Sequence, residues 1–91
     1  MQEFVDRGAG IRAEAKRLVI DYMTATPACH PGGEGIRQAA IFRECGMDWG
    51  DFDKATSSNQ QYWLVAALGQ LHSEGLIEQV EPSGPWRLAV A

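Results

Sequence analysis

Two cysteines and two histidines are the side chains of this chain whose chemistry suits zinc, and they are Cys29, His30, Cys45 and His72. Zinc sites usually draw two of their four ligands from one short segment, in a C-x-x-C or H-x-x-x-H pair. Neither pair occurs in this sequence. We therefore expect no metal and no other cofactor, with His30 in a loop and His72 on the flank of a helix.

Acidic and glycine-rich segments are the next candidates for chemistry. Asp48, Asp51 and Asp53 lie close together, but they lack the glycine and the closing glutamate of a calcium loop, so a solvated acidic loop is expected. The segment Gly32-Gly33-Glu34-Gly35 precedes a predicted helix and could cradle an anion, yet it follows a proline-rich loop and not a strand. Because no nucleophile elbow and no paired catalytic carboxylates are found, we predict that the domain is not an enzyme.

Length and composition indicate one globular domain. The 91 residues are 45% hydrophobic and 22% charged, which is typical of a folded domain and leaves little room for an enzyme cleft. No apolar run reaches the roughly 18 residues of a membrane span, and the first ten residues lack the pattern of a secretory signal. We therefore expect no membrane association and a cytoplasmic location. Two cysteines are too few for a disulfide scaffold, and a Cys29–Cys45 bond is the minor alternative to free thiols.

Charge is distributed unevenly along the chain. The net charge is −4, and six of the eight basic residues precede residue 44, whereas seven acidic residues follow from there onward. Duplex DNA binding draws much of its free energy from the neutralisation of phosphates and the release of counterions. The charge balance therefore argues against tight DNA binding by an isolated monomer.

The first helix is predicted over residues 11–25, after a flexible polar segment at residues 1–10 that contains two glycines. Its apolar stripe is expected to consist of Ile11, Ala15, Leu18, Tyr22 and Ala25, widened by Val19 and Met23. Pro27 ends it. Ile20 is expected to point the other way, beside Ala13, either as a lone exposed apolar residue or as a contact with a second subunit.

The middle of the chain is predicted as a loop, a second helix and a long connection. Residues 26–35 hold two prolines and three glycines and read as a loop, and residues 36–45 read as a helix that Gly46 ends. The connection over residues 46–58 is acidic and carries Trp49 and Phe52. These two aromatic residues are expected to pack back on the body of the domain.

The third helix is predicted over residues 59–74, with Leu64, Ala67, Leu68 and Leu71 as its core stripe. Gly75 stands where a left-handed residue is needed to end it. Apolar and polar residues alternate over residues 76–80, and this segment and residues 86–90 are predicted as two paired strands. A turn that contains Pro82, Gly84 and Pro85 joins them. The sequence therefore predicts a C-terminal β-hairpin.

The segment "LHSEGLIEQV" at the junction of helix and hairpin resembles the winged helix-turn-helix family. In that family a leucine, polar residues, a glycine and an apolar pair lead from the last helix into the hairpin. The resemblance implies an α+β fold, with a three-helix winged-helix domain over residues 11–91 and a C-terminal two-stranded β-hairpin as the wing. It also implies that the third helix is the recognition helix of a DNA-binding or transcription-regulatory module.

Two functions remain open on these grounds. As a DNA-binding module, acting as a homodimer or within a larger assembly, the domain would contact double-stranded DNA through Arg37, Arg43, Asn59, Gln60, Tyr62, Ala66, Gln70 and Arg87. As a protein-interaction module without nucleic acid, it would use Ala13, Ile20, Tyr62 and Trp63, because the outward face of the third helix is uncharged. Packing of Trp63 and Tyr62 on the loop of Trp49, and ion pairing of Arg17 with Asp21, are the structural alternatives.

Overall fold

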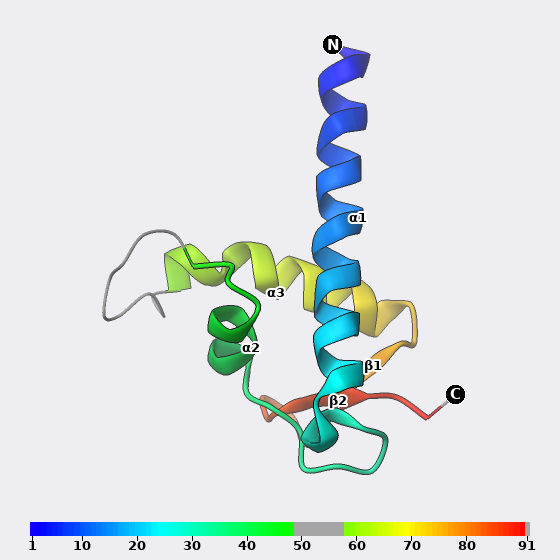
Figure 1. The fold of residues 1–91 in the computed structure, drawn as a ribbon, viewed down its shortest axis with the longest axis vertical. Helices are drawn as coiled ribbons and strands as arrows, with labels where there is room; N and C mark the ends of the chain where they lie inside the picture. The colour runs from blue at the N-terminus through cyan, green and yellow to red at the C-terminus, as the bar shows by residue number, and fades with distance from the viewer. Residues whose placement is uncertain (49–57, 91) are drawn as a thin grey trace.

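A computed structural model describes residues 1–48 and 58–90, and the side chains of residues 58–60 lie outside what it describes. The described ranges form three α-helices, a short 3-10 helix and one two-stranded antiparallel sheet (Figure 1). In chain order these elements are α1 (Gln2–Ala25), η1 (Pro27–Cys29), α2 (Gln38–Glu44), α3 (Ser58–Ser73), β1 (Ile77–Gln79) and β2 (Trp86–Leu88). The predicted α+β architecture of three helices and a C-terminal hairpin is confirmed.

Helix α1 starts far earlier than predicted. It begins at Gln2 and runs for 24 residues, so the predicted helix start at residue 11 is wrong. Two side-chain pairs one helical turn apart support its first turns: Gln2 donates a hydrogen bond to Asp6 at 2.8 Å, and Arg7 lies 3.7 Å from Glu3. These pairs offset part of the cost of two helical glycines, and the N-terminal half of α1 projects beyond α3 (Figure 1).

The buried face of α1 is rotated relative to the predicted stripe. Val19 and Met23 are fully buried in the core, whereas Ile11 and Leu18 are exposed. Ile20 is half-buried against the core, so the prediction that it points outward is wrong. The reason is that α3, η1 and β2 all pack against the side of α1 that carries Val19 and Met23.

Helix α2 packs on α3, and the segment before it pairs with β2. It buries Ile41 and Phe42, and Gly46 follows it with a φ of 66°, as predicted for a left-handed residue after a helix. Ahead of α2, Ile36 pairs with Trp86 of β2 through two backbone hydrogen bonds of 2.9 and 2.8 Å. This bridge ties the middle of the chain to its last strand.

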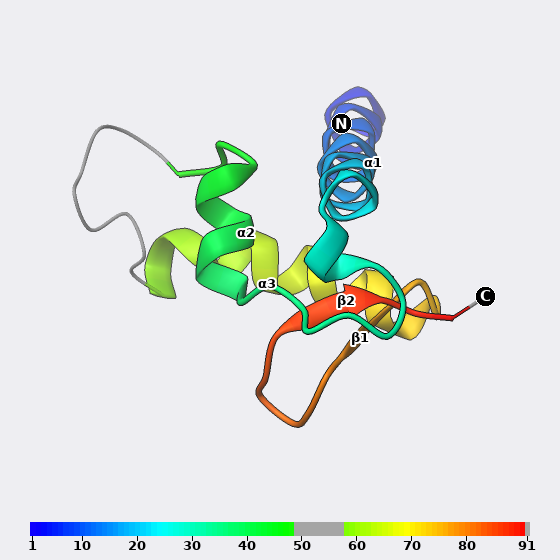
Figure 2. The ribbon, with the colours of Figure 1, turned by 60° about the horizontal axis from the view of Figure 1, so that its bottom comes forward.

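Helix α3 and the hairpin follow the sequence pattern closely. Leu64, Ala67, Leu68 and Leu71 are buried as predicted, and Gly75 ends the helical segment with a φ of 79°. The strands β1 and β2 pair with Ile77 opposite Leu88 and Gln79 opposite Trp86. They are shorter than predicted but stand where the sequence placed them, and Figure 2 shows the hairpin beside the C-terminal end of α3.

One apolar core joins all three helices to the hairpin. Its buried members are Val19, Met23, Cys29, Ile41, Phe42, Leu64, Leu68, Leu71, Ile77 and Trp86. Both cysteines are free thiols, and burial together with Glu44 raises the pKa of Cys45 to about 11. No helix in the described ranges is long and apolar enough to cross a membrane.

Candidate functional site

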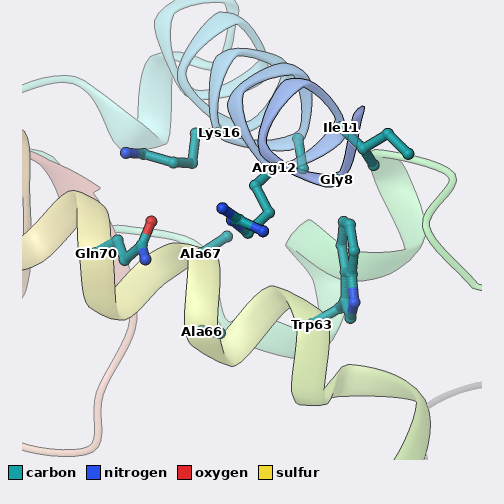
Figure 3. A pocket seen from close by; sticks show the side chains of 9 residues that line it. Gly8, Ile11, Arg12, Lys16, Trp63, Ala66, Ala67 and Gln70 are labelled. Atoms are coloured by element: carbon teal, nitrogen blue, oxygen red, sulfur yellow. The ribbon is translucent and has the colours of Figure 1, made fainter. Parts of the chain in front are cut away.

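A cleft lies in the angle where α1 crosses α3, and it has a volume of about 250 Å³. Figure 3 shows Arg12 of α1 and Trp63 of α3 reaching into the space between the two helices. From α1 the lining residues are Gly8, Ile11, Arg12, Ala15 and Lys16, and from α3 they are Trp63, Ala66, Ala67 and Gln70. The cleft therefore joins two segments that the sequence analysis treated separately.

Small residues on both helices keep the cleft open. Ala66 and Ala67 line the cleft from α3, and Gly8 and Ala15 line it from α1. Because these residues have small side chains or none, they leave space between the two helices. Trp63 stands at one end, where its indole reaches from α3 toward Ile11 on α1 (Figure 3). The exposed fractions of Trp63 and Ile11 are 53% and 57%, so two large apolar side chains face solvent at this end.

Exposed apolar residues continue from the cleft along both helices. Phe4 and Val5 on α1 have exposed fractions of 61% and 59%, and Tyr62 of α3 reaches 67%. If a fully exposed large side chain presents roughly 150–250 Å², the exposed parts of Phe4, Val5, Ile11, Leu18, Tyr62 and Trp63 sum to roughly 700 Å². These six exposed apolar residues are hereafter called the α1–α3 surface.

Two cations border the cleft, and they differ in their partners. The ammonium group of Lys16 lies 2.7 Å from a carboxylate oxygen of Glu74, so its charge is neutralised within the chain. Arg12 forms no ion pair with any residue that the structure describes. Arg12 is thus the side chain at the cleft that can still pair with an acidic group of a ligand.

The predicted DNA-contacting residues of α3 whose side chains the structure describes are all exposed. Tyr62, Ala66 and Gln70 are exposed, and the two last of these line the cleft. Asn59 and Gln60 lie in the first turn of α3, and their side chains are outside the described residues. The exposed part of α3 that is described up to Gln70 carries no charged side chain, so it offers hydrogen-bonding and apolar groups but no phosphate-neutralising cation.

The arginines predicted to contact DNA differ in whether they have partners among the described residues. Arg87 donates to Glu78 at 2.6 Å and to the carbonyl oxygen of Gly33 at 2.9 Å, so it fastens the hairpin to the loop before α2. Arg37 and Arg43 are exposed and form no ion pair within the described ranges. The pair expected between Arg17 and Asp21 does not form, because Arg17 contacts Glu14 at 2.6 Å instead.

The predicted partner-contact residues fall on different surfaces. Trp63 lines the cleft and Tyr62 is exposed beside it, whereas Ala13 is exposed outside the lining and Ile20 packs on the core. The alternative that Trp63 packs on Trp49 and Phe52 involves residues outside the described part. Phe4, Val5 and Gly8 were missed as surface residues of this site because the predicted helix began too late, at residue 11. Ile11 was missed because it was expected in the buried stripe, and Arg12 because it was given no contact. The spacing of Phe4, Gly8, Ile11, Ala15 and Leu18 is the signal that could have found this side of the helix.

Comparison with known proteins gives no match: no family model fits the chain, and no curated protein and no solved structure is significantly similar to it.

Proposed function

We propose that this domain is a protein-interaction module that binds an apolar helical segment of a protein partner in the cleft between α1 and α3. The observation that carries the proposal is the exposure of Trp63 and Ile11 on facing sides of an open cleft of about 250 Å³. Large aromatic side chains in such a position are the residues that contribute most to protein–protein affinity. This is the second of the two functions considered from the sequence.

The size and lining of the cleft favour protein side chains over a small-molecule ligand. Sites for small molecules usually enclose about 300–1,000 Å³, and this cleft is smaller and opens onto more apolar surface along α1 and α3. A partner helix presents apolar side chains at positions i, i+3, i+4 and i+7 and can follow such a groove along its length. An acidic residue on that helix would meet Arg12, which has no carboxylate partner among the described residues.

Peptide binding tests the proposal directly. A panel of helical peptides with an i, i+3, i+4, i+7 apolar face would be titrated into ¹⁵N-labelled protein, with peptides of scrambled apolar pattern as controls. We expect shifts of the Trp63 indole and of the Gly8, Ala15 and Ala66 amides for patterned peptides alone, with dissociation constants in the micromolar range or tighter. Shifts confined to other surfaces, or equal shifts with scrambled peptides, would contradict the proposal.

Two variants separate the cleft from general surface effects. Trp63→Ala removes the aromatic wall and should weaken peptide binding at least about tenfold, because interface aromatics of this kind contribute more than about 1.4 kcal/mol. Arg43→Ala, on the exposed side of α2, should leave peptide binding unchanged. Equal losses in the two variants would place the binding site elsewhere.

DNA binding is the second candidate function, and two exposed arginines at α2 favour it. Arg37 and Arg43 are exposed without a carboxylate partner in the described residues, so their guanidinium groups are free to contact phosphates. On this proposal α3 reads base edges through Gln70. The acidic net charge of −4 limits the affinity of one copy.

A salt titration distinguishes the two candidates. Binding of a labelled duplex measured by anisotropy at about 50 and 200 mM salt should weaken steeply if phosphates are contacted. Arg37→Ala and Arg43→Ala should then reduce affinity for all sequences, and Gln70→Ala should reduce it for some sequences only. Absence of binding at the lower salt concentration would reject DNA as a ligand and leave the peptide proposal intact.

A further inference from the structure

The projecting half of α1 is amphipathic, but the described part of the chain leaves its apolar side uncovered. Phe4, Gly8, Ile11, Ala15 and Leu18 recur at spacings of four and three residues and share one side of the helix. Val19 and Met23 lie one turn farther on and are buried in the core. Among the described residues, the half of α1 with Val19 and Met23 is buried, whereas Phe4 and Ile11 of the projecting half are exposed. Figure 1 shows the N-terminal half of α1 extending beyond α3.

From this contrast we infer that the occupant of the cleft is a second copy of the chain, whose projecting α1 half lies antiparallel across the first and crosses it near Gly8. The inference rests on the proposed function and names its partner. Each copy then offers the same two parts, a projecting helical half and a cleft beside it, which is the self-complementarity that a two-fold dimer requires.

The glycines of α1 support a close crossing at Gly8. A glycine inside a helix costs about 0.5–1 kcal/mol relative to alanine, and no contact among the described residues requires a glycine at position 8. A Cβ there would meet only the end of the flexible Arg12 side chain, at 3.7 Å. Gly8 faces the cleft, so the lack of a side chain lets a second helix approach closely at this point.

The exposed area matches the needs of a dimer. The α1–α3 surface presents roughly 700 Å² of large apolar side chains, and a stable interface buries about 800 Å² on each partner. An antiparallel crossing at Gly8 brings Phe4 and Val5 of one copy opposite Arg12 and Ile11 of the other, which line the cleft. A parallel pair would place the two projecting halves together and leave both clefts open.

Sedimentation equilibrium with matched variants tests the dimer. We expect the wild-type chain to dimerise, and we expect Ile11→Asp to raise the dissociation constant at least about thirtyfold. Ala13→Asp is the control, because Ala13 is an exposed residue of the same helix outside the cleft lining. A second matched pair is Gly8→Gln, which should weaken the dimer because Gly8 lines the cleft, and Gly10→Gln, which should not because Gly10 lies outside the lining. Neither added Cβ meets a described atom closer than 3.7 Å within the monomer.

A distance measurement tests the orientation of the two helices. A spin label at Gln2→Cys in a Cys45→Ser background leaves Cys29 as the other thiol, and Cys29 is fully buried. In an antiparallel pair that crosses at Gly8, the two label positions lie about 18 Å apart along the helix axes, from a rise of about 1.5 Å per residue. In a parallel pair they lie about 10 Å apart. The longer distance supports the inference, and the shorter one overturns it.

The possible failures are distinguishable. A chain that stays monomeric at all concentrations, or that Ala13→Asp dissociates as strongly as Ile11→Asp, overturns the second-copy occupant. If patterned peptides still shift the Trp63 indole of that monomer, the proposed function stands and its partner is a different protein. If neither self-association nor peptide binding involves the cleft, both proposals are rejected. Circular dichroism of each variant confirms that α1 remains helical.

Discussion

The two halves of α1 show how one helix can be built for two environments. The C-terminal half places Val19 and Met23 in the core with no exposed surface, whereas in the N-terminal half Phe4, Val5 and Ile11 are each more than half exposed. Both halves have apolar residues at helical spacing. The helical spacing of apolar residues therefore identifies the apolar side of a helix, but it does not say which chain covers that side.

Truncation of an apolar side chain should separate the two halves most clearly. Met23→Ala is expected to lower the free energy of unfolding by about 2–5 kcal/mol, because it removes buried atoms and leaves a cavity. Phe4→Ala should change it by less than about 0.5 kcal/mol when the protein is dilute enough to be monomeric. Urea denaturation monitored by circular dichroism measures both, and equal losses would show that the N-terminal half is also packed within its own chain.

A substitution at Tyr22 tests a buried polar group in the C-terminal half of α1. Its hydroxyl is buried and finds no hydrogen-bond partner in the described structure, while burial and the nearby Glu44 raise the pKa of the phenol above 10.0. Tyr22→Phe should therefore raise the free energy of unfolding by about 1 kcal/mol near pH 7. Because the folded state holds the phenolic proton longer than the unfolded state, the wild type loses stability as pH rises above about 10. Tyr22→Phe should lose less over the same range, and a steeper loss would contradict the assignment.

The smallest expected change in stability is that of Gly10→Ala, which tests the exposed N-terminal half of α1. Gly10→Ala should stabilise the monomer by about 0.5 kcal/mol, because alanine is the better helix former and the added Cβ meets no atom within 4 Å. Thermal unfolding at low concentration provides the measurement. Destabilisation would mean that the helix in this half is less regular than the ion pair and hydrogen bond of its first turns indicate.

The sequence predicted the C-terminal half of the fold well because its signals are local. Leu64, Leu68 and Leu71 repeat at helical spacing, Gly75 ends the helix, and a proline- and glycine-containing turn joins two short apolar segments. Each of these features acts within a few residues of its own position. They therefore fix α3 and the hairpin without reference to the rest of the chain.

The sequence predicted α1 less well because its apolar residues spread around the helix. Between residues 11 and 25, Leu18, Val19 and Ile20 follow one another, so the pattern does not select one buried face. The two glycines at positions 8 and 10 were read as breakers, although side-chain pairs across the first turns support the helix there. The cleft depends on how α1 crosses α3, and this angle is set by packing between distant segments.

The candidate residues divide on the same principle. Tyr62 and Trp63 lie outside the core stripe of α3, and both are exposed as their place on the helix predicts; that they contact a partner stays a prediction. Arg87 was predicted as a ligand contact, yet it pairs with Glu78 and with the backbone of Gly33, which is far away in the sequence. A tertiary partner of this kind leaves no local signal in the sequence.

The bridge between Ile36 and Trp86 also governs the order in which the molecule can assemble. Its two residues are separated by more than half of the chain, so the loop that joins them must close before their hydrogen bonds can form. The helices can form from near neighbours, but the segment that leads into α2 acquires its final position only after the last strand has been made. A nascent polypeptide that has not yet reached Trp86 would therefore lack the link that fixes the segment leading into α2.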